Sequence, residues 1–194
     1  MKKVIALLFV FTFVASTFAQ DNIRIKDITV SSGRGALSSG LYVGINIDPG
    51  DTTANLTFEA TADYVQAIYV KKFGILSIGP SAGYFQNAPW IGPFIKIQPA
   101  DFISLVSWEG VSAGQANDPA FNVQYSFAYN SLRIDVAPVY VCFTTLSFQK
   151  DRLNCLVGSG FTIPLGKKIS FGVSCDYSLR DSEPLFASSI SYQF

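Results

Sequence analysis

Hydrophobic and polar residues alternate with a period of two along much of this chain. The ending LFASSISYQF shows the pattern most clearly, with Phe186, Ile190, Tyr192 and Phe194 on one face of an extended strand and small or polar residues on the other. Successive side chains of a strand point to opposite faces, so this pattern predicts a strand with one apolar and one polar face. The same alternation recurs in the segments 54–63, 121–130, 132–137, 157–163 and 169–179.

Turn-forming residues separate these segments at regular intervals. Segments of about ten residues that alternate apolar-out and polar-in are typical of membrane-spanning β-barrels. We predict about ten strands, within a range of roughly eight to twelve, because 54–70 reads as one long strand or as two. The predicted strands are 37–48, 54–70, 75–85, 90–98, 102–112, 121–130, 132–143, 154–163, 169–179 and 185–194.

The connections are predicted to alternate between the two ends of the barrel. Asn130 and Ser131 are predicted to form a two-residue turn between two strands. Tight connections at 71–74, 98–101 and 164–168 are placed on the periplasmic side, and those at 48–53, 86–89, 114–120, 148–153 and 180–184 at the opposite end. An even strand number then puts both termini in the periplasm.

Residues 1–19 have the features of a secretory signal peptide. Lys2 and Lys3 precede an apolar stretch over 4–15, and small residues at Thr17 and Ala19 predict cleavage after Ala19. The apolar stretch is too short to cross a bilayer as a helix. Residues 20–36 are predicted to form a periplasmic lead, or an extra strand over 23–30, and the barrel is predicted to span 37–194.

The composition favours a surface that faces lipid. The chain is 49% hydrophobic and only 14% charged, whereas a water-soluble domain carries about 25% charged residues. Without Lys2 and Lys3 the chain has 12 basic and 14 acidic residues, and this balance argues against a nucleic-acid partner. A soluble periplasmic lipocalin-like barrel is the rival class, but it would put its polar residues outside, and the charge-poor faces argue against it.

The chain resembles the small outer-membrane barrels typified by OmpA-like and OmpX-like proteins. The strand pattern and the ending with Ile190, Tyr192 and Phe194 carry the resemblance, which does not specify a subfamily. It implies an all-β, closed, antiparallel up-and-down barrel in the outer membrane of a Gram-negative bacterium, in contact with outer-membrane lipid. It also implies that the terminal aromatic residue and the apolar residues at alternate positions before it are recognised by the barrel assembly machinery.

The chemistry of the chain argues against an enzyme. It contains no histidine, so a Ser–His–acid triad or a histidine general base is impossible. The small-barrel enzymes, such as omptin proteases and the lipid A palmitoyltransferase, rely on a catalytic histidine. The sequence also lacks a glycine-rich phosphate loop and metal-ligand spacing. We therefore expect no catalytic residue, no metal and no cofactor.

The alternation places charged side chains in the lumen. Side chains fill the interior of a narrow barrel, and an unpaired charge there is costly. We expect an ion-pair network around Arg133, a largely plugged lumen and a structural or interaction role. The alternatives are a narrow cation-favouring pore, because acids outnumber bases, or a barrel that binds lipid or a small molecule. The predicted lumen charges are Glu59, Asp63, Arg133, Asp135 and Asp176, together with Lys96 and Glu109.

Prolines within the predicted strands suggest irregularities in the wall. Each proline removes a hydrogen-bond donor from the ladder. Pairing around the 86–89 connection sets Pro80 nearly opposite Pro93, which predicts local bulges or a lateral gap. Such a gap is similar to the proline-flanked openings of the lipid A palmitoyltransferase.

Cysteines and tryptophans are assigned to the outer face. Cys142 and Cys155 would lie opposite each other across the 148–153 connection, so a disulfide is one alternative and three unbonded thiols the other. Trp90 and Trp108 lie near predicted strand ends and are interpreted as part of an interfacial aromatic girdle.

Overall fold

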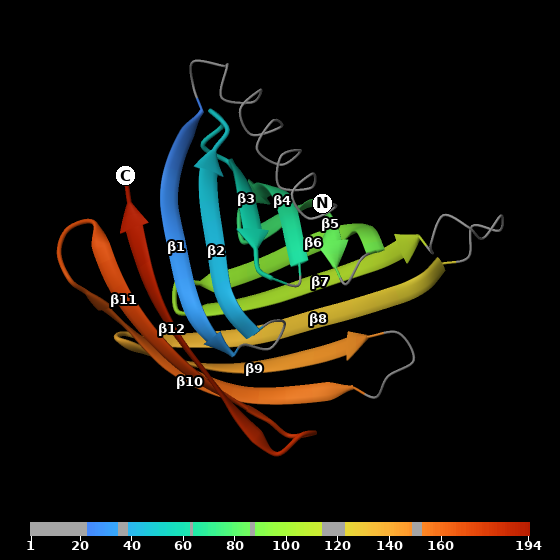
Figure 1. Ribbon diagram of the computed structural model, residues 1–194. Helices are drawn as coiled ribbons and strands as arrows, with labels where there is room; N and C mark the ends of the chain where they lie inside the picture. Colours follow the sequence, from blue (N-terminus) through green and yellow to red (C-terminus); the bar gives the residue numbers. More distant parts are fainter. Residues whose placement is uncertain (1–22, 35–38, 63, 86–87, 114–122, 149–152) are drawn as a thin grey trace.

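A computed structural model describes residues 23–34, 39–62, 64–85, 88–113, 123–148 and 153–194. These residues form twelve strands, shown in Figure 1: β1 (Arg24–Arg34), β2 (Ser39–Asp48), β3 (Ala54–Ala60), β4 (Tyr64–Phe73), β5 (Leu76–Phe85), β6 (Ala88–Ala100), β7 (Ile103–Ala113), β8 (Val123–Val136), β9 (Val139–Phe148), β10 (Asn154–Pro164), β11 (Ile169–Ser178) and β12 (Glu183–Gln193). No helix in these segments is long and apolar enough to span a membrane.

The strands close into a single barrel. Each strand pairs antiparallel with its neighbours in sequence, and β1 pairs with β12 to complete the ring. A closed ring has no edge strand, so backbone N–H and C=O groups are paired between neighbouring strands. Lipid could not supply hydrogen bonds to these groups. The predicted fold class, an all-β antiparallel up-and-down barrel, is confirmed, with a strand count at the top of the expected range.

Two strands more than the ten expected are present, both in the first part of the chain. Of the two alternatives for residues 20–36, the structure shows the extra strand, β1, so the barrel begins at Arg24 rather than at residue 37. The 54–70 segment is two strands, β3 and β4. Residues 1–19, with the predicted signal peptide, lie outside the described residues. Because β1 starts the ring, the 48–53 connection lies at the same end as the C-terminus, not at the opposite end as predicted.

The predicted turn at Asn130 and Ser131 is wrong. Both residues lie inside β8, which runs without a break to Val136. The apolar pattern changes phase at this point, which mimics a turn. The structure shows that the inward face of β8 changes instead, from aromatic Phe127 and Tyr129 to polar residues that follow.

We call the end where β1 begins and β12 ends the terminal end, and the opposite end the loop end. Residues that line cavities in the lumen define the inward face, such as Thr57 of β3 and Lys96 of β6. Residues between them form an apolar outer face, where Val141, Val157 and Phe186 are about half exposed. The outer face therefore has the composition expected of a wall in contact with lipid.

Candidate functional site in the barrel lumen

Toward the loop end, the lumen holds a cluster of aromatic rings from β6, β7 and β8. The ring centroid of Trp90 lies 5.1 Å from that of Trp108 and 5.0 Å from that of Phe127, and the Trp108 and Phe127 centroids lie 4.8 Å apart. All three pairs meet edge to face, an arrangement that stabilises aromatic pairs. Both tryptophans are buried, so these rings fill space that water would otherwise occupy.

The polar atoms of this cluster have partners. The indole N–H of Trp108 donates to Oγ of Ser81 at 3.1 Å, and the Ser81 hydroxyl donates to the backbone carbonyl of Gly92 at 2.9 Å. A buried polar group without a partner would cost about 1–3 kcal/mol. This chain of hydrogen bonds lets an indole pack deep in the lumen without that penalty.

Glycines on neighbouring strands make room for the rings. A Cβ at Gly83 would lie 2.9 Å from the ring of Trp90, and a Cβ at Gly110 would overlap the ring of Phe127. The absence of a side chain at these two glycines therefore leaves room for the large aromatic rings.

A leucine cluster continues the aromatic one around the barrel. Leu146 of β9, Leu156 of β10 and Leu185 of β12 are buried against one another, and Tyr129 packs on them. The Tyr129 ring centroid also lies 6.2 Å from that of Trp108. Together these residues form a continuous apolar layer from β6 to β12, which we call the lumen plug.

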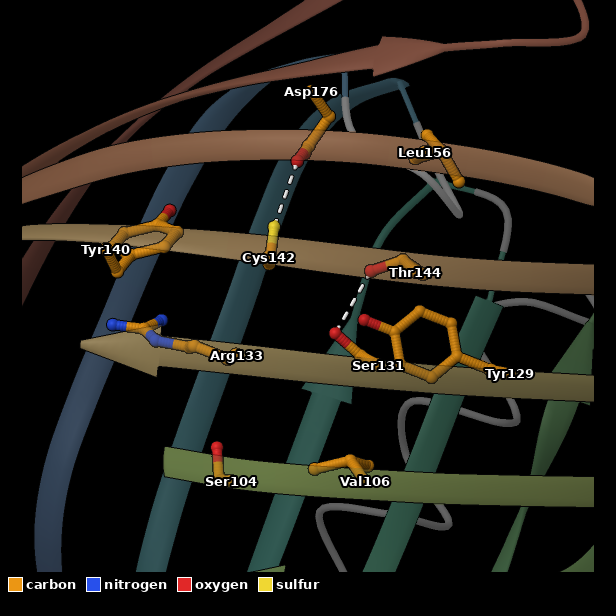
Figure 2. A pocket seen from close by; sticks show the side chains of 10 residues that line it. All are labelled: Ser104, Val106, Tyr129, Ser131, Arg133, Tyr140, Cys142, Thr144, Leu156 and Asp176. Carbon is orange, nitrogen blue, oxygen red and sulfur yellow. Dashed lines mark hydrogen bonds between the residues drawn. The ribbon is translucent and has the colours of Figure 1, made fainter. Parts of the chain in front are cut away.

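Toward the terminal end, the lumen contains polar cavities. One, of about 300 Å³, is lined by residues of β7 to β11 and appears in Figure 2. There Arg133 donates from Nε and Nη2 to Oδ1 of Asp135 at 2.9 and 2.6 Å, and its guanidinium carbon lies 3.8 Å from the ring centroid of Tyr140. The Arg133 and Asp135 side chains are 43% and 38% exposed, so this ion pair is partly hydrated.

The strands β9 and β11 contribute a thiol and a carboxylate to the same cavity. Cys142 donates from Sγ to Oδ1 of Asp176 at 3.5 Å, as Figure 2 shows. A Cβ at Gly158 would overlap the carboxylate of Asp176, so the glycine makes the room that Asp176 occupies. Ser131 and Thr144 are hydrogen-bonded at 3.0 Å nearer the lumen plug.

A second cavity, of about 480 Å³, lies between β1 and β6. Glu59 accepts hydrogen bonds from the hydroxyl of Tyr42 at 3.0 Å and from Nε2 of Gln66. Lys72 and Lys96 line the same cavity. Both donors to Glu59 are neutral groups, so this carboxylate is held without an ion pair.

Amide and hydroxyl side chains form a hydrogen-bond network at the terminal end of this cavity. Asn46 donates from Nδ2 to Asp27 at 2.8 Å and accepts from the Thr57 hydroxyl at 2.7 Å. Asn55 donates to Thr57 at 3.0 Å. These neutral partners, rather than salt bridges, hold most of the polar lumen together.

The structure brings the predicted lumen charges together only in part. Glu59 and Lys96 line one cavity and Arg133 and Asp176 line the other, with Asp135 bonded to Arg133. In the described residues the ion pair of Arg133 joins it to Asp135 alone, so the expected network among several carboxylates is not seen. Asp63 lies outside the described residues.

Glu109 does not face the lumen, contrary to the prediction. Ser104 and Val106 of the same strand line a lumen cavity, so Glu109 points the other way. It is exposed on the outer face, between exposed Leu105 and Val111. A charged residue was assigned inward because lipid disfavours charge, and here the strand periodicity decides otherwise.

The sequence analysis missed several lumen residues. Asp27 lies in the segment taken as a lead, and Lys72 lies in a predicted turn. Tyr42 and Tyr129 are aromatic and were therefore not considered as lumen residues. All four would have been identified if the alternation had been extended along each whole strand from a residue known to face inward.

The assignment of tryptophans and cysteines also needs correction. Trp90 and Trp108 belong to the lumen plug and form no interfacial girdle. Cys142 faces the lumen, whereas Cys155 pairs in register with Thr145 on the outer face, so no disulfide joins them. The third cysteine, Cys175, is unbonded as well.

Pro80 and Pro93 lie directly opposite each other, as predicted. On both flanks, between β4 and β5 and between β6 and β7, two residue pairs are missing from the ladder at this level, and the register continues unchanged beyond them. A Cβ at Gly79 would overlap the carbonyl of Tyr69, so the neighbouring backbone approaches closely there. A lateral gap at this level stays a prediction.

The predicted assembly residues lie on the outer face at the terminal end. Ile190, Tyr192 and Phe194 are exposed, and the rings of Tyr192 and Phe194 meet edge to face at 4.9 Å. Their recognition by the assembly machinery stays a prediction. In the described residues, no group of histidine, cysteine and acidic side chains could hold a metal ion.

No protein-family model and no curated protein matches the chain. Among solved structures it is similar to a KdgM porin, at 12% identity and a TM-score of 0.50, over 88% of this chain and 99% of that chain. A KdgM porin in complex with disordered oligogalacturonate matches at 12% identity and a TM-score of 0.53, with the same coverage. Likeness at this identity shows the fold alone. The chain has a porin-like β-barrel fold that points to the outer membrane of a Gram-negative bacterium.

Proposed function

We propose that this protein is an outer-membrane barrel with a structural or interaction role whose lumen is closed toward the loop end. The lumen plug carries this proposal, because it places aromatic rings and leucines across the space that a solute would have to cross. Tyr64 of β4, on another part of the wall, is buried as well.

Packing supports a lasting closure. A close-packed interior has few voids larger than a water molecule, and removing a large side chain leaves a cavity at considerable cost. The plug side chains come from the barrel wall itself, and strand pairing holds their backbones. No loop would need to move to keep the barrel shut.

Planar-bilayer recording tests the proposal. The wild-type protein should show little or no steady conductance, and a variant with Trp90→Ala, Trp108→Ala and Phe127→Ala should conduct. Phe186→Ala, which removes an aromatic ring from the outer face, is the control and should stay closed. Steady wild-type channels that are unchanged in the triple variant would contradict the proposal.

A second candidate function is a narrow porin-like pore, favoured by the fold of the KdgM porin neighbours. One of those neighbours was solved with oligogalacturonate. The described lumen contains Lys72, Lys96 and Arg133 beside its acids. Such a pore would not favour cations strongly, and the reversal potential of the triple variant in a salt gradient would measure its selectivity.

A role without catalysis is part of the proposal. The chain has no histidine, and the similar solved structures are porins by name. Outer-membrane lipid and the barrel assembly machinery are the partners we propose, because the outer face is apolar and the chain ends in exposed aromatic residues.

A further inference from the structure

The outer wall carries polar residues in the middle of β7, β8 and β9, three strands that lie side by side (Figure 1). They occupy two neighbouring rows of the sheet. We call them the outer polar patch, which consists of Ser107, Asn130 and Thr145 in one row and of Glu109 and Ser147 in the next, where Ala128 lies between them.

Strand periodicity places this patch outside. Val106 of β7, Ser131 of β8 and Thr144 of β9 line a lumen cavity. Their immediate neighbours Ser107, Asn130 and Thr145 therefore point away from the lumen. Glu109 follows Ser107 on the same face and is exposed.

Apolar side chains surround the patch on its strands. Leu105 and Val111 flank it on β7, Leu132 follows it on β8, and Phe143 precedes it on β9; all four are exposed. Glu109 is the seventh residue of Ile103–Ala113 and Asn130 the eighth of Val123–Val136, so these two residues lie near mid-wall, whereas Ser147 is next to last in Val139–Phe148. Hydrocarbon cannot hydrogen-bond a carboxylate or an amide, and lipid-facing charges destabilise barrels most near the bilayer midplane.

The chain itself does not satisfy these groups. Within the described part of the chain, the side chains of Ser107, Glu109, Asn130 and Thr145 form no hydrogen bond or ion pair. The ladder between β6 and β7 also lacks its residue pairs at Gly92 and Pro93, and Pro93 has no N–H to donate. A partner outside the barrel is needed to supply donors at this depth.

We propose that the outer polar patch binds a second copy of this chain within the membrane. Two copies inserted in the same direction are related by a two-fold axis along the membrane normal, and such an interface presents the same surface on both sides. If this two-fold axis passes in front of β8, then β7 of one copy faces β9 of the other copy. Glu109, which only accepts hydrogen bonds, then faces the hydroxyls of Thr145 and Ser147 in the second copy.

The centre of the patch fits the same symmetry. Asn130 lies on the middle strand and meets its own counterpart, and an amide pair satisfies a donor and an acceptor on each side. A ring of three or more copies would need a second, different surface complementary to this one. The self-complementary arrangement therefore favours a dimer, and it does so whether or not the lumen conducts.

The mass of the protein–detergent complex tests the proposal. Full-length protein extracted from outer membranes into mild detergent should have the protein mass of a dimer by light scattering. The double variant Glu109→Leu, Asn130→Leu should be monomeric, because apolar side chains suit lipid as well as a partner. Ser188→Leu makes the same kind of change on exposed β12 and should stay dimeric. Migration of unboiled samples on gels checks that every variant is a folded barrel.

Crosslinking in intact membranes identifies the partner. In a background with Cys142→Ser, Cys155→Ser and Cys175→Ser, Asn130→Cys should give a disulfide-linked dimer on oxidation, and Ser188→Cys should not. A monomeric wild type, a dimer that survives the double leucine change, or a crosslink only to a different protein would each overturn the proposal.

Discussion

The two halves of the lumen are built on the same strands but by different means. On β8 the inward positions pass from Phe127 and Tyr129 to Ser131, Arg133 and Asp135 within a single strand. The loop-end half is filled by packed, buried rings and leucines, whereas the terminal-end half contains polar cavities held by hydrogen bonds. The difference predicts that the proposed closure of this barrel depends on side-chain packing more than on ion pairs.

Removing an indole from the lumen plug should have the largest effect. Trp108→Ala should lower the free energy of unfolding by about 3–5 kcal/mol, because it deletes a ring that contacts three aromatic partners and leaves Ser81 without its donor. Urea titration in lipid vesicles, followed by circular dichroism, measures the change. Tyr177→Ala, on the outer face of β11 and 43% exposed, should cost much less; equal losses would remove the distinction between plug and wall.

A smaller contrast lies within one strand. Leu156→Ala should cost about 2–5 kcal/mol, because Leu156 is 2% exposed in the plug. The adjacent Val157 is about half exposed on the outer face. Val157→Ala should lower the free energy of unfolding by less than about 1 kcal/mol, since the side chain contacts lipid rather than the plug. The same titration compares the two variants, and a reversed order would show that the facing of β10 is wrong.

The terminal-end half should respond weakly to loss of its ion pair. Arg133→Ala should cost only about 1 kcal/mol, because both side chains of the pair are more than a third exposed. Breaking a fully buried pair would cost about 3–5 kcal/mol. A loss of that size in the urea titration would mean that the polar half is as dry as the plug.

The smallest effect concerns the 49–53 turn beyond the polar half. Hydrogen bonds from the Thr53 hydroxyl and N–H, and then Lys71 at 3.3 Å, lower the pKa of Asp51 from 3.8 to about 2. A lowered pKa stabilises the fold above the unfolded value of 3.8, and that contribution is lost as the pH falls toward 2. Asp51→Asn should slightly lower the melting temperature at pH 5, and the difference should vanish near pH 2.

Alternation in the sequence was sufficient to predict the barrel class, because one face of nearly every strand must meet lipid. It did not locate the lumen plug. Aromatic residues suit both a lipid-facing girdle and a close-packed interior, so Trp90 and Trp108 carry no sequence signal that separates the two. Only the register from one strand to the next decides the matter, and that register is a tertiary property.

The errors in β8 and β7 have related causes. The inward face of β8 changes from apolar to polar on either side of Asn130. This change shifts the hydrophobic pattern by one residue, and in the sequence such a shift is indistinguishable from a tight turn. Glu109 was taken as a lumen residue because charge is rare on a lipid-facing wall. The polar cavities were predicted more closely, since Glu59, Arg133 and Asp176 follow the alternation of their strands.

The opposed facing of Cys142 and Cys155 affects which disulfides are compatible with the folded chain. Before folding, any two of the three thiols can meet and be trapped as a crosslink that blocks strand pairing. Once the registers form, Cys142 is enclosed beside Asp176, and Cys175 pairs with Ser159 rather than with Cys155. The folded registers thus keep the three thiols apart, so a chain that carries a disulfide between any two of them could not form this barrel.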